Sequence, residues 1–117
     1  MSQWKQLANE VLDELKIEKD MLFGNKIKQL RDENGVLQRQ LAAYLEIDTP
    51  MFSKIERGDR FAKRSHVLLL AKYFDVDEKM MLTLWLADKI LATVKGEAEV
   101  SIESLDTAKA QLKGVNR

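Results

Sequence analysis

The side chains with the clearest capacity for chemistry form a basic cluster in the middle of the chain. Its members are the cationic residues Lys54, Arg57, Arg60, Lys63 and Arg64. Residues 24–65 hold nine Lys or Arg against six Asp or Glu, although the net charge of the whole chain is zero. A local basic patch is typical of a phosphate-binding surface, but it also fits an ordinary solvated face of a helix. Charge alone does not separate these two interpretations.

Catalytic chemistry finds much weaker support. His66 is the only histidine, and it lies beside Ser65 at the start of a predicted helix, where a surface or capping role is more common than a catalytic one. A base there would need an orienting acid and a nucleophile, and no such group stands out. Cysteine is absent, and the sequence has no Gly-rich phosphate loop and no cluster of metal ligands. We therefore expect no enzymatic activity, no metal and no cofactor.

The basic cluster must be positioned by helices, because apolar residues recur at helical spacing and strict alternation is missing. We therefore expect an all-α fold. The breaks fall at Asn34-Gly35, at Gly58 and around residues 75–77. The expected helices span about residues 3–18, 24–33, 38–45, 48–57, 63–74, 77–94 and 101–112.

Two short helices joined by a tight turn lie at the centre of this pattern. The apolar residues spaced to bury both helices against a third element are Leu41, Ala42, Leu45, Ile47, Phe52 and Ile55. The second helix has Asp48 as an N-cap and Pro50 in its first turn, and Gly58 ends it. Its polar side should therefore face outward.

This segment resembles the lambda-repressor-like, or Xre-type, helix-turn-helix regulators. The resemblance rests on Gln38-x-x-Leu41-Ala42, followed by SKIERG at residues 53–58, and covers about residues 24–76. It implies a bundle of about five helices, with the helix that begins near Asp48 entering the major groove of double-stranded DNA. The resemblance thus implies a sequence-specific transcription regulator, and we expect a repressor.

The resemblance also assigns DNA contacts by position. Gln38 matches a glutamine that typically contacts a phosphate and helps to orient the recognition helix. The positions that face base edges are Thr49, Pro50, Met51 and Lys54, of which Lys54 could donate to guanine. The positions that look like phosphate contacts are Arg57, Arg60, Lys63 and Arg64. Ser53, on the same outward face, completes the expected DNA-binding set.

Glu56 needs a different role, because an unpaired carboxylate near DNA is unfavourable. In the family, the matching glutamate turns inward to an arginine of the helix before the motif, and the matching position here is Arg31. Three positions depart from the family pattern: Leu37 replaces a Ser or Thr cap, Glu46 replaces a turn glycine, and Ala62 replaces a common proline. A positive φ angle at Glu46 would cost on the order of 1 kcal/mol. These departures affect the turn geometry and leave the core pattern intact.

The segment 80–91 is apolar on nearly every side, so it must be covered from more than one direction. We expect a homodimer, because a two-fold dimer would match a palindromic DNA site. The expected interface residues are Leu82, Trp85, Leu86 and Ile90. The alternative is that the N-terminal helix folds back over this surface within one chain. The expected division is an arm at 1–20, a DNA-binding domain at 21–76 and dimerisation helices at 77–117.

Two further expectations concern location and partners. The first residues lack a signal-peptide pattern, and no stretch is apolar for the roughly 18 residues that a membrane span needs. We therefore expect a cytoplasmic protein that does not enter a membrane. The alternatives to a plain repressor are an antitoxin that also binds a protein toxin and a controller of restriction-modification genes. Segment 1–20 could be a packing arm, a dimer element or an extension.

Overall fold

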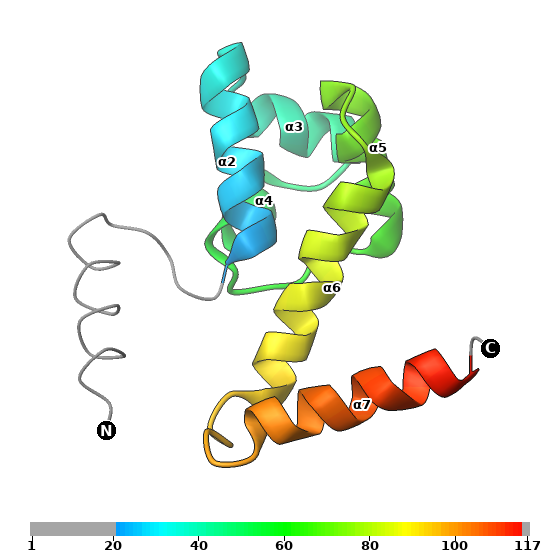
Figure 1. Ribbon diagram of the computed structural model, residues 1–117. Coiled ribbons are helices and arrows are strands. Elements are labelled where there is room, and N and C mark those ends of the chain that lie inside the picture. The colour runs from blue at the N-terminus through cyan, green and yellow to red at the C-terminus, as the bar shows by residue number, and fades with distance from the viewer. Residues whose placement is uncertain (1–20, 116–117) are drawn as a thin grey trace.

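The computed structural model describes residues 21–115, and within that range all of the regular secondary structure is helical (Figure 1). The expected all-α class is therefore confirmed. The expected helix at residues 3–18 lies outside the described residues. The helices are α2 (Leu22–Asn34), α3 (Gln38–Leu45), α4 (Thr49–Arg57), α5 (Arg64–Phe74), α6 (Glu78–Val94) and α7 (Ser101–Val115).

Several helix ends follow directly from local residue chemistry. The Asp48 carboxylate accepts a hydrogen bond of 2.7 Å from the Met51 N–H, which caps α4 as expected. Asp77 caps α6 in the same way. The helix before each break ends in left-handed backbone, at Gly35 with φ of 63° and at Gly58 with φ of 82°. Two helix ends differ from the prediction. Helix α2 begins before residue 24, and α7 continues past residue 112.

The turn between α3 and α4 places Glu46 in left-handed backbone. Glu46 has φ of 59° and ψ of 40°, and its N–H bonds back to the carbonyls of Ala42 and Ala43. A left-handed glutamate costs about 1 kcal/mol relative to a glycine there. Asp75, at the predicted break after α5, also adopts left-handed backbone, with φ of 53°. Leu37 provides no side-chain cap for α3, and the Gln40 side chain instead accepts from the Leu37 N–H at 2.7 Å.

One apolar core joins α2 to α6. Its buried members are Phe23, Ile27, Leu30, Leu41, Ala42, Leu45, Phe52, Ile55, Ala62, Val67, Leu70, Ala71 and Met81. The residues predicted to bury the helix pair are all among them except Ile47, which is partly buried at the edge. The pairs in closest contact are α5 with α6, α3 with α4, and α2 with both α4 and α6. The core packs against one side of α4, the side that carries Phe52 and Ile55.

Gly24 allows α2 to cross α4 at very short range. A Cβ atom at this position would overlap the carbonyl oxygen of Glu56 and lie 3.3 Å from that of Ile55. Glycine is therefore required near the start of α2, although it lowers helix propensity. The contact sets the distance between the first helix of the bundle and the outer helix α4.

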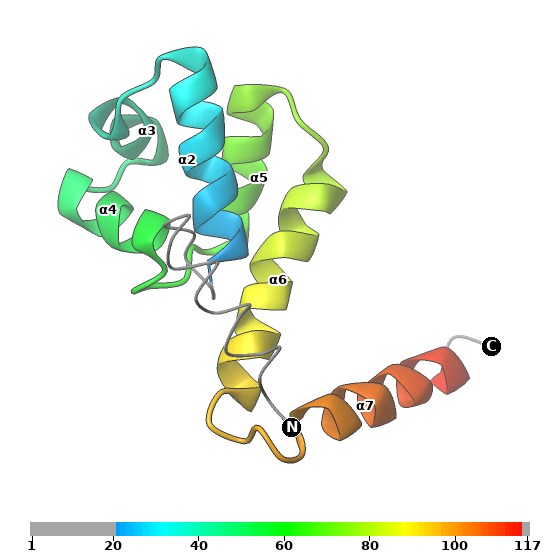
Figure 2. The ribbon, with the colours of Figure 1, turned by 60° about the vertical axis from the view of Figure 1, so that its left-hand side comes forward.

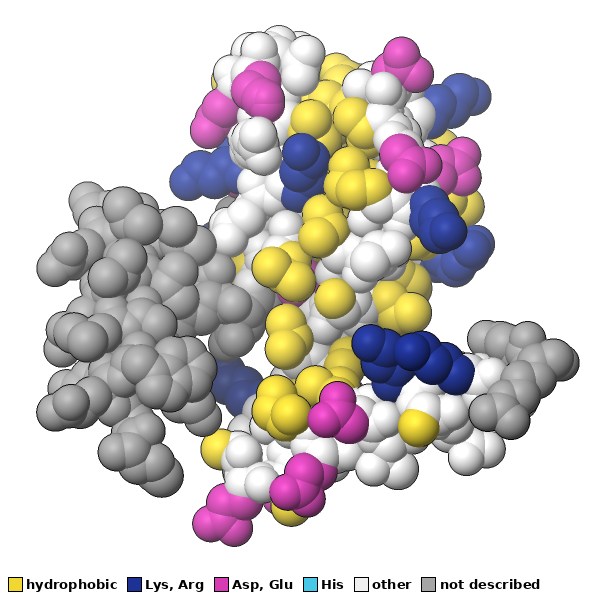
Figure 3. Space-filling model, in the orientation of Figure 1, with side chains coloured by type: hydrophobic (Ala, Val, Ile, Leu, Met, Phe, Trp, Pro, Cys, Tyr) yellow, Lys and Arg dark blue, Asp and Glu magenta, His cyan; other side chains and the backbone are white. Residues whose placement is uncertain are grey.

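The last two helices extend the bundle in an L shape. α6 runs out of the bundle, and α7 turns away from it after the residues around Gly96 (Figures 1 and 2). Hydrophobic side chains form a band down the face of the molecule that carries α6 (Figure 3). Between residues 21 and 115 there is no helix both long enough and apolar enough to cross a membrane.

Candidate nucleic-acid interface

Helix α4 lies at an outer edge of the bundle, beside α3 (Figure 2). Phe52 and Ile55 fasten its inner side to the core. Thr49, Pro50 and Lys54 are exposed on its other side. The capped N-terminus and these three side chains therefore face solvent together, as the sequence pattern predicted.

Two α4 residues expected to contact DNA, Met51 and Ser53, are only partly exposed. Met51 is partly buried and packs against the apolar core. Ser53 is also partly buried, and its hydroxyl accepts a hydrogen bond of 2.8 Å from Nη1 of Arg57. Ser53 thus holds a neighbouring cation in place in the free protein.

The basic residues expected at phosphates continue from α4 into α5. Arg57, Arg60, Lys63 and Arg64 are all exposed, and the last of them opens α5. Nε of Arg57 also donates to Asp59 at 3.1 Å, in an ion pair with both partners well exposed. Because exposed pairs of this kind contribute little, Arg57 can exchange Asp59 for a phosphate at small cost.

Glu56 is the centre of a network that turns it away from solvent. Its carboxylate accepts from Nε of Arg31 at 2.7 Å, from Nη2 of Arg31 at 2.8 Å and from Nε2 of Gln38 at 2.8 Å. The remaining guanidinium nitrogen donates to the Val36 carbonyl at 3.1 Å. The expected Arg31–Glu56 pair is thus present, and the hydrogen bond to Glu56 raises the pKa of Arg31 above its ordinary value.

Gln38 is the first residue of α3, and its amide links α3 to α4 through Glu56. This geometry matches the orienting part of its expected role. The Gln38 amide nitrogen carries a second N–H, which remains a donor for a phosphate. Arg39, exposed one residue further along α3, was missed by the sequence analysis. It stands apart from the dense basic cluster in sequence, but it lies on α3 of the same helix pair.

The expected dimer residues of α6 occupy two different environments. Leu86 and Ile90 are 51% and 42% exposed, one turn apart. Leu82 and Trp85 are partly buried and pack against the core. The Trp85 indole N–H donates to the Ala62 carbonyl at 2.8 Å. Only half of the expected set therefore faces outward.

Two more features complete the surroundings of the basic residues. The Lys89 Nζ atom lies over the Trp85 ring, 3.9 Å from its centroid, in a cation–π contact. His66 is partly buried, and its Nδ1 atom is buried without a hydrogen-bond partner. Burial, followed by the nearby Lys63 charge, lowers the pKa of His66 below its ordinary value. Both effects favour the neutral imidazole.

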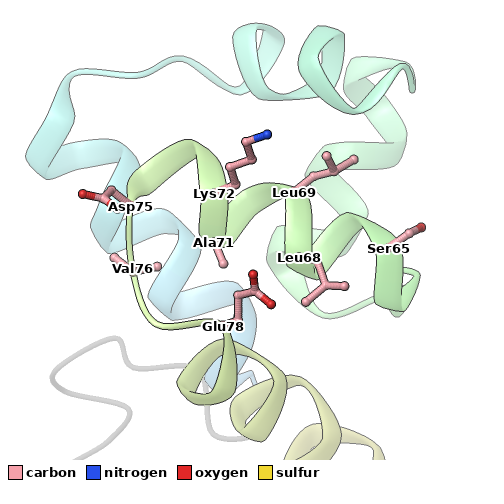
Figure 4. Close-up of a pocket in the computed structure, with 8 residues that line it drawn as sticks. All are labelled: Ser65, Leu68, Leu69, Ala71, Lys72, Asp75, Val76 and Glu78. Carbon is pink, nitrogen blue, oxygen red and sulfur yellow. The ribbon is translucent and has the colours of Figure 1, made fainter.

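An open groove of about 610 Å³ separates α5 from the start of α6 (Figure 4). Its lining consists of Ser65, Leu68, Leu69, Ala71, Lys72, Asp75, Val76 and Glu78. Lys72 and Asp75 point away from the centre of the groove, whereas the Glu78 carboxylate points toward it (Figure 4). In the part of the chain that the structure describes, no three His, Asp or Glu side chains are grouped to hold a metal ion.

Asp88 is a structural residue that the sequence analysis missed. It is buried, and it accepts hydrogen bonds from the backbone N–H groups of Leu22 and Phe23 at 2.9 Å each. The sequence signal was a lone acid within the otherwise apolar stretch of α6. Such an acid predicts a buried partner, but it does not say which one.

Comparison with known protein families identifies the domain that the bundle forms. A family model described as a helix-turn-helix domain matches residues 22–84, which is more than half of the chain. The matched region runs from α2 into α6 and includes the α3–α4 pair. No curated protein and no solved structure gave a match. The match supports a DNA-binding, transcription-regulating role, and the chain belongs to the helix-turn-helix domain family.

Proposed function

We propose that this protein is a sequence-specific double-stranded DNA-binding regulator of the Xre type that acts as a homodimeric repressor. The observation that carries the proposal is the network around Glu56. Because Arg31 and Gln38 hold this carboxylate inside the bundle, the outer face of α4 presents polar and cationic groups without an opposing acid of its own. An outward helix with that chemistry fits the major groove.

Base recognition in this proposal falls on few side chains. Lys54 is exposed and can donate to guanine O6 or N7, and Thr49 can offer its hydroxyl to a base or its methyl group to thymine. Pro50 is exposed next to Thr49 but has no donor, so it supplies apolar contact only. Met51 packs partly against the core, which leaves it a smaller share of the interface. A single α4 therefore has limited power to discriminate between sequences.

Affinity would come from the phosphates. The exposed cations at the end of α4 and the start of α5, with Arg39 on α3, can follow the DNA backbone on either side of the groove. Each phosphate neutralised releases counterions, so the logarithm of the binding constant should fall with the logarithm of salt concentration by about 0.9 per contact. Four or five such contacts would make binding strongly salt-sensitive.

Dimerisation would supply the discrimination that one α4 lacks. In the proposal, residues 21–76 read the DNA and residues 77–117 join two copies. Leu86 and Ile90 give α6 an apolar surface that nothing in the described chain covers fully. A two-fold dimer would place its α4 helices on two half-sites separated by about one helical turn, roughly 34 Å. The DNA site should then be an inverted repeat.

Selection of bound duplexes from a random pool tests the proposal directly. The expected result is an inverted repeat, enriched by the full-length protein and bound in fluorescence anisotropy with a steep salt dependence. Lys72→Ala, an exposed lysine at the α5–α6 groove, is the matched control and should bind as the unchanged protein does. Absence of duplex affinity at low salt would refute the DNA-binding proposal, and enrichment of a single half-site would refute the dimer.

A further inference from the structure

The loop between α4 and α5 carries part of the proposed phosphate-binding surface. It spans residues 58–63 and includes the exposed cations Arg60 and Lys63. Its first residues are fixed locally, because the Asp59 N–H donates to the Lys54 carbonyl at 2.8 Å. The two cations follow that bond, so their position depends on what holds the rest of the loop.

Local structure gives the second half of this loop little support. Within residues 21–115, no backbone–backbone hydrogen bond involves Arg60, Phe61 or Ala62. Lys63, which directly precedes α5, forms no side-chain hydrogen bond that would cap that helix. A segment without such bonds opens readily unless tertiary contacts hold it. The contacts that hold this segment come from α6.

Trp85 of α6 supplies the first of these contacts. Its indole N–H donates to the Ala62 carbonyl at 2.8 Å, between positions that are 23 residues apart in the chain. Ala62 is itself buried, and backbone carbonyl groups at buried positions require a partner of this kind. The bond therefore fixes the backbone of the loop one residue before Lys63.

Lys89 lies one helical turn after Trp85 and supplies a second contact. Its Nζ atom is 3.9 Å from the centroid of the Trp85 ring and 5.7 Å from the centroid of the Phe61 ring. A cation at these distances is attracted to the faces of both rings. Lys89 thus joins α6 to the side chain of Phe61, which is adjacent to Arg60 in the loop.

The loop and α6 are closely packed where they meet. Arg60, Phe61 and Ala62 line a cavity of only about 20 Å³ between the loop, α2 and α6, and Trp85 lines the same cavity. A space of that size is little more than one water molecule needs. The loop therefore has little room to move against α6.

We propose that Trp85 and Lys89 are positioning residues of the DNA interface, although neither contacts DNA. They hold the α4–α5 loop so that Arg60 and Lys63 face the phosphate backbone before a duplex binds. Because the loop is already ordered, less free energy is lost in ordering it on binding, which favours affinity. The inference rests on the proposed DNA binding, and it assigns Trp85 a task within a single copy of the chain.

Trp85→Phe tests the hydrogen bond, because it removes the indole N–H and keeps an aromatic ring. In anisotropy titrations of the full chain, the affinity for all duplexes should fall by about three- to tenfold, the cost of ordering about one side chain. The salt slope should decrease by about one, since a loop cation loses its phosphate. The base preference should not change, because Thr49 and Lys54 are unaffected. Thermal unfolding checks that the variant is folded at the temperature of the titration.

Lys89→Met tests the cation and is independent of the tryptophan. It should also weaken binding to all duplexes, whereas Lys89→Arg should bind as the unchanged protein does. Lys79→Met, the same change of charge at an exposed position of α6, is the control and should leave the salt slope unchanged. Lys89→Met combined with Trp85→Phe should cost less than the sum of the two changes, because both act through one loop. Fully additive losses would show that Lys89 binds a phosphate itself and would overturn its positioning role.

Nitrogen-15 relaxation of the free protein gives a readout that does not depend on DNA. Trp85→Phe should lower the order parameters of residues 60–63 and leave those of α4 unchanged. Unchanged order in the loop, or a looser loop with unaltered duplex binding, would overturn the positioning role and leave the α4 interface standing. Absence of duplex affinity in the unchanged protein at low salt would instead refute the proposed function, while the relaxation data still decide whether Trp85 holds the loop.

Discussion

Asp88 of α6 caps the first turn of α2, with its Oδ2 atom 2.9 Å from the backbone N of Phe23. Its other carboxylate oxygen accepts from the Leu22 N–H at the same distance. Met21, which precedes the helix, offers no side-chain hydrogen bond of its own. The first N–H groups of a helix lack partners within it and carry partial positive charge, so a buried carboxylate is stabilising there. Asp88 thereby fastens α6 to the start of the DNA-binding bundle.

Replacing Asp88 with Ala should lower the free energy of unfolding by about 1–3 kcal/mol, because two N–H groups would be left without an acceptor. Asp88→Asn should cost less, since one side-chain oxygen remains. Urea denaturation followed by circular dichroism measures both. Glu99→Ala, at an exposed position before α7, is the control. Equal stability of the Asp88→Ala and Glu99→Ala variants would contradict the capping role.

This cap also shows where prediction from sequence stops. The starts of α4 and α6 were predicted to within one residue. Their capping residues, Asp48 and Asp77, are close in sequence to the N–H groups that they cap. The start of α2 was placed too late, because its cap comes from a residue far along the chain. Local chemistry can be read from a sequence, whereas a tertiary partner requires the fold.

Gly24→Ala should be strongly destabilising, by roughly 2 kcal/mol or more, since its methyl group would overlap the Glu56 carbonyl oxygen. The backbone cannot give way there without separating α2 from α4. Gly114→Ala is the matched control, because nothing lies within 4 Å of the added methyl group. It should stabilise α7 by up to about 1 kcal/mol. Gly24→Ala should lower the unfolding temperature of the bundle, whereas Gly114→Ala should not lower it, and a tolerated Gly24→Ala would disprove the close crossing.

A double-mutant cycle measures the Arg31–Glu56 pair. Glu56→Met should cost about 3–5 kcal/mol, because it leaves the Arg31 guanidinium, whose side chain is 12% exposed, without its carboxylate. Adding Arg31→Met should recover part of that loss, since no unpaired charge then remains. Chemical denaturation of the four proteins gives the coupling. Strictly additive losses would show that the two residues act independently.

The candidate site was predictable wherever it depends on helical spacing. The outward positions of Thr49 and Lys54 follow from the burial of Phe52 and Ile55 on the opposite side of the same helix. The pairing of Arg31 with Glu56 came from the resemblance to a family. Neither source could show that Gln38 also bonds to Glu56, because that contact depends on the angle between α3 and α4.

His66 should titrate below its ordinary pKa of about 6.5, because burial and the Lys63 charge both disfavour the imidazolium. The neutral form then favours the folded state. Because the folded-state pKa is lower than the unfolded one, the free energy of unfolding is highest above pH 6.5. It decreases as the pH falls from 6.5 through the folded-state pKa. As His66 is the only histidine, its ring protons give a direct NMR titration. Lys63→Gln should raise the pKa, and a wild-type pKa at or above 6.5 would contradict the expectation.

Lys54 and Arg57 should differ in what they contribute to DNA binding, although both are exposed cations on α4. Lys54→Ala should reduce discrimination at one base position by about 1–3 kcal/mol, because a groove contact reads sequence. Arg57→Ala should weaken all duplexes alike and lower the salt slope by about one, as a phosphate contact does. Ser53→Ala removes the hydroxyl group to which Arg57 donates. It should therefore also weaken binding to all duplexes alike, but by less than Arg57→Ala does. Anisotropy titrations against the selected site and a scrambled duplex, at several salt concentrations, separate these effects. A sequence-dependent loss from Arg57→Ala would reverse the assignment of the two roles.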